Sequence, residues 1–352
     1  MSERAPLQVD INNCRHQAMI GVGGIGSGSF FALRGNHTLG REESRGGRFL
    51  DRRDYCKLHI VSHYVKSLLG PEFRTISIGQ VGDDAVGRRL LSEMKDAGLE
   101  LGYVPRVAGD QTLFSFCFVY PDGSGGNLTT DDSACAKVDA PFVTGAEPEF
   151  ARHAGHGVAL AAPEVPLEAR EKLLNLGTEY GFFRAASFLA EEMISALEMG
   201  MLGQTDLLAI NVDEAAAAAG TSLAEASDSV LEIVEAAVEK LRDINPGLLV
   251  SITAGKNGSW SWDGEALVHV VAFPAKVVST AGAGDAHLAG IVAGLVADLT
   301  LPQAQELGTL VAAHSVTSPH TIDKRIDRRS LRTFAEEINA PLCEALGDLL
   351  KG

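Results

Sequence analysis

The chain has 352 residues, 45% hydrophobic and 22% charged, a globular composition that allows two domains or one large domain and excludes collagenous or disordered proteins. Its 46 acidic and 30 basic residues give a formal net charge of -16, which opposes binding to nucleic acid or to anionic membranes. The five scattered cysteines predict free thiols in a reducing compartment. The polar amino terminus lacks a signal-peptide core and no apolar run approaches about 18 residues, so we expect a cytoplasmic protein without a membrane partner.

Strand-like and helix-like runs alternate along most of the chain. Short apolar runs that predict strands occur at 18–22, 75–78, 206–210 and 248–252. Apolar residues recur at helical spacing in 84–97 and in 222–241. This alternation is typical of βαβ units, and it predicts an α/β fold with a central, mainly parallel sheet flanked by helices.

The first predicted strand runs into a glycine-rich segment, Gly21-Val-Gly-Gly-Ile-Gly26, which satisfies the G-x-G-x-x-G pattern of dinucleotide-binding proteins. That pattern should open a helix, but Gly28 and Gly35 follow and would weaken one. We therefore favour a glycine turn at the carboxyl edge of the sheet. An NAD-dependent oxidoreductase remains the less supported alternative.

Two segments interrupt the alternation. Residues 34–53 form a glycine-rich loop with six arginines, which is either a solvated loop balanced by its acidic neighbours or a binding surface for an anionic acceptor. Residues 112–120 form a long apolar run followed by PDGSGG, which predicts a β-hairpin. We predict one α/β domain over 1–352, with a small β lid formed by parts of 28–55 and 105–132.

Residues 279–285, Ser-Thr-Ala-Gly-Ala-Gly-Asp, precede an apolar, small-residue helix predicted over 286–295. The first turn of a helix leaves backbone N–H groups free to bind an anion such as a phosphate. Asp285 could accept a proton from a hydroxyl that attacks a phosphoryl group, or it could simply cap the helix. These residues alone leave both interpretations open.

The segment resembles the signature of the ribokinase-like (PfkB) carbohydrate kinase family, close to D-T-x-G-A-G-D-x-F. Thr280, Gly282, Ala283, Gly284 and Asp285 match it. Further similar elements follow the family's order: the segment at 78–87, the lid strand beginning at Thr112, an N-x-x-E at 211–214 and a T-x-G-x-x-G at 253–258. The resemblance covers about residues 18–325.

This resemblance implies an ATP-dependent kinase that transfers the γ-phosphoryl group to a hydroxyl of a carbohydrate or related small molecule. Asp285 would be the catalytic base, and the backbone of Gly282, Ala283 and Gly284 would stabilise the transferred group. The nucleotide would contact Thr253, Gly255, Gly258, Asn211 and Glu214. Asn211 and Glu214 would also organise Mg²⁺ through water, although the same pair fits an ordinary helix start. A monovalent cation and a homodimer formed through lid edges are further expectations.

The acceptor side departs from the family pattern. Members usually carry an aspartate at the end of the first strand, where this chain has glycines, Ser27 and Gly28. The family's G-G-x-x-x-N element is missing, and His59 is the closest polar substitute. His287 stands where the signature has Phe. We predict Ser27, Gly28 and His59 as acceptor residues, and a non-catalytic ligand-binding protein on the same fold remains an alternative.

Overall fold

The computed structural model describes residues 4–122, 125–221 and 229–351, and its centre is a nine-stranded sheet in the order β16-β15-β14-β13-β12-β11-β1-β5-β7. Its strands are β1 (Ala18–Val22), β5 (Arg74–Ile78), β7 (Glu100–Tyr103), β11 (Gly157–Ala161), β12 (Phe183–Ala186), β13 (Leu207–Asn211), β14 (Leu249–Thr253), β15 (Ser259–Trp262) and β16 (Leu267–Val270). Neighbours from β14 to β7 pair in parallel, whereas β15 and β16 are antiparallel. The predicted mainly parallel sheet is confirmed, and each of the four predicted strands lies within one residue of an observed strand.

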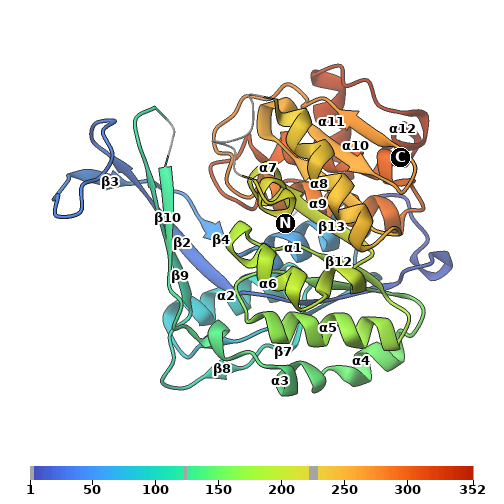
Figure 1. Cartoon of the computed structure of the whole chain (residues 1–352), viewed down its shortest axis with the longest axis horizontal. Helices are drawn as coiled ribbons and strands as arrows, with labels where there is room; N and C mark the ends of the chain where they lie inside the picture. Colours follow the sequence, from blue (N-terminus) through green and yellow to red (C-terminus); the bar gives the residue numbers. More distant parts are fainter. Residues whose placement is uncertain (1–3, 123–124, 222–228, 352) are drawn as a thin grey trace.

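Helices cover both faces of this sheet (Figure 1). They are α1 (Lys57–Leu69), α2 (Ala85–Asp96), α3 (Ala140–Thr144), α4 (Glu147–Arg152), α5 (Leu167–Glu179), α6 (Met193–Glu198), α7 (Val212–Ala219), α8 (Val230–Ile244), α9 (Ala283–Val296), α10 (Leu301–Ser315), α11 (Arg328–Glu337) and α12 (Glu344–Leu350). The helix predicted over 84–97 is α2. Of the one predicted over 222–241, residues 222–228 lie outside the described residues, and α8 continues to Ile244.

The core consists of two buried clusters, one on each face of the sheet. Met19 belongs to the cluster that contains residues of α1, α9 and α10, whereas Ile20 and Val22 belong to the cluster that contains residues of α5, α7 and α8. Successive side chains of a strand point to opposite faces, so all five residues of β1 are buried. None of the helices within the described residues combines the length and apolar character that a membrane-spanning helix requires.

A second, five-stranded sheet stands apart from the body, at the left of Figure 1. It consists of β2 (Gly26–Leu33), β3 (Gly47–Phe49), β4 (Asp54–Tyr55), β9 (Leu113–Val119) and β10 (Gly125–Thr129). The hairpin predicted at 112–120 is confirmed by the antiparallel pairing of β9 with β10. Because β2 begins at Gly26, a strand stands where a dinucleotide-binding fold needs a helix, as the glycines at 28 and 35 indicated.

Asp84 joins this second sheet to α2. Its carboxylate accepts a hydrogen bond of 2.7 Å from the N–H of Gly87 and thereby caps the helix. It also accepts bonds of 2.7 and 2.8 Å from the backbone N–H and the hydroxyl of Thr112, the residue before β9. The family-like segment at 78–87 therefore fixes the start of β9, and β6 (Val81–Gly82) extends this junction by pairing with β8 (Arg106–Val107).

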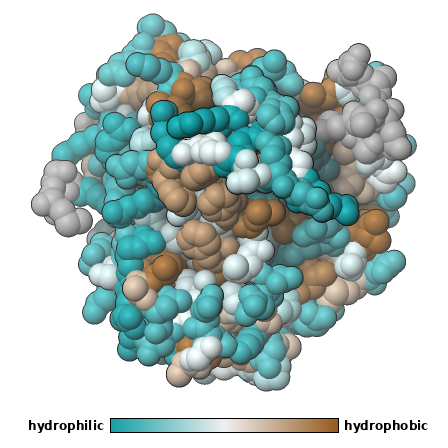
Figure 2. Space-filling model, turned by 90° about the vertical axis from the view of Figure 1, so that its left-hand side faces the viewer, coloured by the Kyte–Doolittle hydropathy of each residue, from teal (hydrophilic) through white to brown (hydrophobic). Residues whose placement is uncertain are grey.

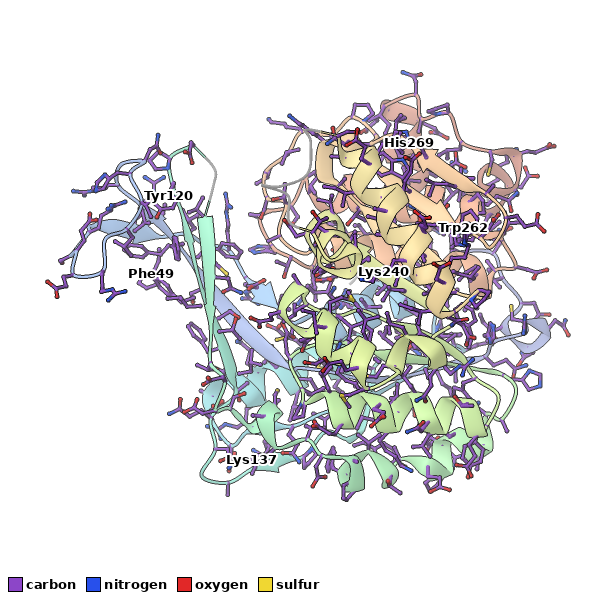
Figure 3. All side chains as sticks on the ribbon, in the orientation of Figure 1. Phe49, Tyr120, Lys137, Lys240, Trp262 and His269 are labelled. Atoms are coloured by element: carbon purple, nitrogen blue, oxygen red, sulfur yellow. The ribbon has the colours of Figure 1, made fainter. Side chains whose placement is uncertain are left out.

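The outer face of the second sheet is aromatic. The rings of Phe31, Phe49 and Phe116 lie 5.1 to 6.3 Å apart, and Leu128 is paired in register with Phe116. Phe49 and Leu128 are 67% and 65% exposed. Figure 2 shows apolar side chains gathered on this side of the molecule, and Figure 3 shows Phe49 far from the body. We call these four residues the aromatic face.

Close packing of α9 against α10 generates a prediction about stability. A Cβ at Gly290 of α9 would lie 2.6 Å from the Cα of Gly308 in α10, whereas a Cβ at Gly347 of α12 would meet nothing within 4 Å. We expect Gly290→Ala to lower the free energy of unfolding by about 1–3 kcal/mol through overpacking. Gly347→Ala, the matched control, should raise it by up to about 1 kcal/mol because alanine favours the helix. Urea denaturation measures both, and an equal effect of the two substitutions would contradict the packing argument.

Candidate active site

Helix α9 begins at Ala283, so the glycine-rich segment is itself part of the first turn, three residues earlier than predicted. Gly282 precedes the helix with φ of 77°, a left-handed conformation, and a Cβ there would lie 2.9 Å from the Cβ of Thr321. Only glycine fits such a position without strain. The first-turn N–H groups lack partners within the helix, and Asp285 stands among them. This arrangement provides both an anion-binding turn and a carboxylate.

A cavity of about 700 Å³ lies in front of this turn. Every residue predicted for the phosphate and nucleotide sites lines it: Asn211, Glu214, Thr253, Gly255, Gly258, Gly282, Ala283, Gly284 and Asp285. Asn211 and Thr253 end the neighbouring parallel strands β13 and β14. The cavity therefore lies outside the carboxyl ends of the strands, where open α/β sheets bind their ligands. His287 also lines it, and burial lowers the pKa of this imidazole to about 4.

The arrangement of Asn211 and Glu214 is compatible with both interpretations of their spacing, a helix start and a pair that organises Mg²⁺. The Asn211 side chain accepts a bond of 2.9 Å from the Glu214 N–H, and the Glu214 carboxylate accepts one of 2.8 Å from the Asn211 N–H. This capping box starts α7. Burial raises the pKa of the Glu214 carboxyl, and the charge of Lys57 opposes that shift. The described residues contain no cluster of three acidic, histidine or cysteine ligands, so a metal ion here would depend on phosphates and water.

A second, smaller cavity of about 160 Å³ adjoins the first. It lies between the second sheet and the body, and its lining consists of Ser27, Asp54, Tyr55, Cys56, Lys57, Ser115, Asn127, Pro163, Glu164, Leu189 and Asp285. Its volume is below the roughly 300–1,000 Å³ typical of pockets for drug-sized ligands, so it suits a small molecule. Lys57 and Asp285 line both cavities and mark their junction.

Lys57 is a residue that the sequence analysis missed. It is the first residue of α1, and its ammonium lies 3.3 Å from Asp285 Oδ1 and donates a bond of 2.7 Å to the hydroxyl of Ser187. Burial disfavours its charge, but Asp285 and Glu214 outweigh that effect and raise its pKa. Burial also raises the pKa of Asp285, with Lys57 opposing the shift. A lysine in the first turn of a helix is electrostatically unfavourable unless it has an acidic partner. Its position at the start of a helix could therefore have indicated that Lys57 pairs with an acid elsewhere in the fold.

Two further acidic residues of the small cavity were also missed. Glu164 follows β11 at the carboxyl edge of the sheet, and a Cβ at Gly24 would lie 2.6 Å from its Oε2 atom. Burial raises the pKa of Glu164 to about 7. Asp54 reaches the cavity from β4, and burial raises the pKa of its carboxyl as well. The sequence contained two weak indications of these acids. One was the pair of glycines at 24 and 28, which lack side chains near the end of the first strand, and the other was a glutamate shortly after the strand at 157–161.

The three predicted acceptor residues have different outcomes. Ser27 lines the small cavity, and its hydroxyl accepts a bond of 2.8 Å from Arg89. Gly28 makes room for Asp54, because a Cβ there would lie 2.6 Å from Asp54 Oδ2. The structure does not support His59: its ring is buried in α1 against Tyr55, at 4.7 Å between centroids, and it lines neither cavity. The apolar face of α1 accounts for this, because His59 points into the core.

The arginine-rich loop does not reach the small cavity, which none of its six arginines lines. Arg45 pairs with Glu43 at 2.7 Å and Arg53 pairs with Glu93 at 2.9 Å. The solvated-loop interpretation therefore fits the structure better than binding of an anionic acceptor. Asp54, the acidic residue that directly follows the loop, lines the cavity instead of balancing these arginines.

Glu164 generates a prediction about stability and pH. Its carboxyl pKa is 4.5 in a free glutamate and about 7 in the folded protein, so the folded state holds the proton more tightly. The cost of ionising it grows as pH rises between those values and is fully present above the higher one. We expect Glu164→Gln to raise the free energy of unfolding by about 1–3 kcal/mol near pH 8 and much less near pH 5. Denaturation at both pH values tests this, with exposed Glu191→Gln as the matched control; a pH-independent effect would contradict it.

Comparison with known proteins agrees with this geometry. A 43% identical match over 67 residues links the chain to the fructoselysine 6-kinase of Shigella flexneri, covering 19% of this chain and about a quarter (26%) of the length of that relative. The 5-dehydro-2-deoxygluconokinase of Geobacillus kaustophilus is 26% identical over 278 residues, 75% of this chain and 80% of its own. The structure of ribokinase from Cryptococcus neoformans in complex with ADP has the same fold, with a TM-score of 0.73 at 16% identity over 92% of this chain and 99% of its own. The model of the pfkB family carbohydrate kinases matches residues 61–328, more than half of the chain, which therefore belongs to that family.

Proposed function

We propose that the protein is an ATP-dependent carbohydrate kinase that transfers the γ-phosphoryl group to a hydroxyl of a small acceptor. The observation that carries this proposal is the position of Lys57 and Asp285 at the junction of two cavities. The larger cavity has the anion-binding turn of α9 at its wall, and the smaller one can hold a small polar molecule. Relatives named as sugar kinases and a neighbour that binds ADP support the same class of reaction.

The chemistry of transfer follows from the groups at the junction. Asp285 accepts the proton of the acceptor hydroxyl, whose oxygen forms a bond to the γ-phosphorus while the bond from that phosphorus to the bridging oxygen of ADP breaks. The raised pKa of Asp285 makes this carboxylate a stronger proton acceptor than a solvated one. The N–H groups of the α9 turn and the ammonium of Lys57 stabilise the charge on the phosphoryl oxygens.

Asn211 and Glu214 fit the role of organising a magnesium ion. Both residues line the larger cavity, and Mg²⁺ in kinases is typically held by one or two carboxylates, water and substrate phosphates. The ion would neutralise phosphate charge when bound. The requirement for a monovalent cation, the cytoplasmic location and the single-domain organisation stay predictions from the sequence.

We assign the second sheet as a lid over the acceptor. Ser27, Ser115 and Asn127 come from three of its strands and line the small cavity opposite Asp285. A cover of this kind excludes water from the junction and thereby suppresses hydrolysis of ATP. The contacts of Asp84 with Thr112 provide an anchor for its base.

Substitution of Asp285 tests the proposed reaction. We expect Asp285→Asn to lower kcat for sugar-dependent ADP release by about 10²–10⁴-fold, because the acceptor hydroxyl loses its base. Binding of ATP, measured by calorimetry, should persist because the α9 turn is intact. A companion variant, Gly284→Ala, separates the two roles: a Cβ there meets nothing nearer than Thr253 Oγ1 at 3.9 Å, so the fold is undisturbed while the methyl group enters the phosphate space. It should weaken ATP binding by roughly tenfold or more.

The opposite pattern would reject the assignment. Unimpaired transfer by Asp285→Asn would show that another group removes the proton. Unchanged ATP affinity of Gly284→Ala would show that the phosphates bind elsewhere. Thermal unfolding of both variants confirms that the fold is retained.

We further propose that two copies of the chain associate through the aromatic face. This contiguous apolar surface is unusual for an isolated soluble sheet, and the edge strands beside it can pair with another copy. Figure 2 shows hydrophobic side chains at the centre of this side of the molecule, with hydrophilic side chains above and below them. We expect the protein to sediment as a dimer, and Phe49→Asp to shift it to a monomer at micromolar concentration. Leu231→Asp, a change at a residue of α8 that is 44% exposed, is the matched control, and a monomeric parent protein would refute the proposal.

A further inference from the structure

Thr321 joins the second sheet to the anion-binding turn of α9, although it lines neither cavity. It lies in the connection between α10 and α11, and only 1% of it is exposed. Its backbone N–H donates a bond of 3.0 Å to the carbonyl of Arg53, and its hydroxyl accepts one of 3.1 Å from the N–H of Tyr55. These two bonds hold the peptide groups on either side of Asp54, the residue of β4 that lines the small cavity. Thr321 thereby positions the strand that carries Asp54.

The hydroxyl of Thr321 takes the part of a backbone carbonyl. In a regular pair of strands a backbone carbonyl would accept the N–H of Tyr55. The carbonyl of Thr321 instead accepts a bond of 3.4 Å from the phenol of Tyr64, whose oxygen accepts one of 2.7 Å from the N–H of Asp323. Tyr64 belongs to α1 and is completely buried, so it anchors the connection to the body. The side chain of Thr321 is therefore required to pair β4.

The same connection packs against the anion-binding turn. A Cβ at Gly282 would lie 2.9 Å from the Cβ of Thr321 and 3.0 Å from its carbonyl oxygen, so the two backbones are in close contact. The carbonyl of Val316, at the start of the connection, accepts bonds of 2.8 and 3.2 Å from the N–H groups of Val278 and Ser279. A shift of residues 316–321 therefore displaces the turn whose N–H groups face the larger cavity.

A second sheet that acts as a lid has an open and a closed position, and β4 moves with it. Closely packed, buried contacts do not deform gradually, so they transmit the position of one element to the next. Phosphates bound to the α9 turn favour one position of that turn, and through Thr321 they favour the matching position of β4. Lys57 and Asp285 link the two cavities through charge, whereas Thr321 links them through backbone position.

We propose that Thr321 is a positioning residue that couples the two cavities, so that a nucleotide in the larger cavity stabilises β4 in its closed position beside the smaller one. This inference rests on the proposed kinase function and concerns the regulation of the same site. By thermodynamic linkage, an acceptor strengthens ATP binding by the same factor by which ATP strengthens acceptor binding. The direction from nucleotide to β4 can therefore be measured without an identified acceptor.

Amide hydrogen exchange tests the coupling on the full-length protein, with and without a non-hydrolysable ATP analogue and Mg²⁺. None of residues 53–56 lines the larger cavity, so a change there is not caused by direct contact with the nucleotide. We expect the analogue to slow exchange in the α9 turn and, by about fivefold or more, at the N–H of Tyr55. Slower exchange in the turn with no change at Tyr55 would overturn the proposal.

Two substitutions of Thr321 identify the group responsible. Thr321→Val keeps the shape of the side chain and removes the acceptor of the Tyr55 N–H, so exchange at this amide should become faster. The analogue should then no longer slow it, although it still protects the α9 turn. Thr321→Ser retains the hydroxyl and should restore the slowing. Full slowing in Thr321→Val, or its loss in Thr321→Ser, would refute the role of the hydroxyl.

Thr205→Val is the matched control. Thr205 is also 1% exposed, its hydroxyl donates a bond of 2.9 Å to the carbonyl of Met201, and it lines neither cavity. We expect this variant to be less stable but to show the same slowing at Tyr55 as the parent protein. Loss of the slowing here would assign the effect to general destabilisation and reject the specific role of Thr321. The parent protein tests the coupling even if Thr321→Val does not fold.

The design separates this inference from the kinase proposal. Absence of any protection in the α9 turn would show that the nucleotide does not bind there, which would reject the kinase proposal and the coupling with it. Protection of the turn without a response of β4 would support nucleotide binding and reject the coupling alone.

Discussion

The left-handed turn at Gly282 is the constraint on which the arrangement of the site depends. It allows α9 to begin immediately against Thr321, so that N–H groups of its first turn that lack partners within the helix and the carboxylate of Asp285 face the same space. A side chain at Gly282 would move this turn, which forms a wall of the larger cavity and whose Asp285 also lines the smaller one. The packing of Gly290 against Gly308 then fixes the direction of the helix behind it. Backbone geometry, more than any single polar contact, therefore defines where phosphoryl transfer can occur.

Charge at the junction is balanced locally rather than by bulk solvent. Lys57 and Asp285 have side chains only 19% and 16% exposed, and their ion pair opposes the burial that raises the pKa of the aspartate. Burial raises the pKa of Glu214 on the nucleotide side and of Glu164 on the acceptor side, and the same ammonium opposes both shifts. One lysine thus couples the electrostatics of both cavities. A change of charge in either cavity is therefore felt by Asp285 through this shared partner.

The nucleotide side was predictable from sequence because its function resides in contiguous segments. Asn211 and Glu214 share one helical turn, Thr253 to Gly258 form one loop, and Gly282 to Asp285 form another, so each motif carries its own geometry. The acceptor side was not predictable in this way. Asp54 and Glu164 are brought together only by the pairing of β2 with β4 and by the order of strands in the main sheet. His59 is predicted as an acceptor residue because it is the closest polar substitute for the missing G-G-x-x-x-N element, whereas the helical period turns its ring into the core.

The same difference between the main sheet and the small cavity explains where the folded state contains destabilising features. The main sheet and its helices form continuous apolar clusters in which local propensity and packing agree. Around the small cavity they conflict. Glu164 adopts a left-handed backbone, and its buried Oε2 atom has no hydrogen-bond partner among the described residues. The absence of side chains at Gly24 and Gly28 leaves the space that Glu164 and Asp54 occupy. Such features destabilise the folded state and persist only where surrounding structure holds them in place. Because hydrogen bonds from a bound acceptor would satisfy these polar groups, part of the free energy lost in the empty site is recovered on binding, so a bound acceptor favours closure of the second sheet.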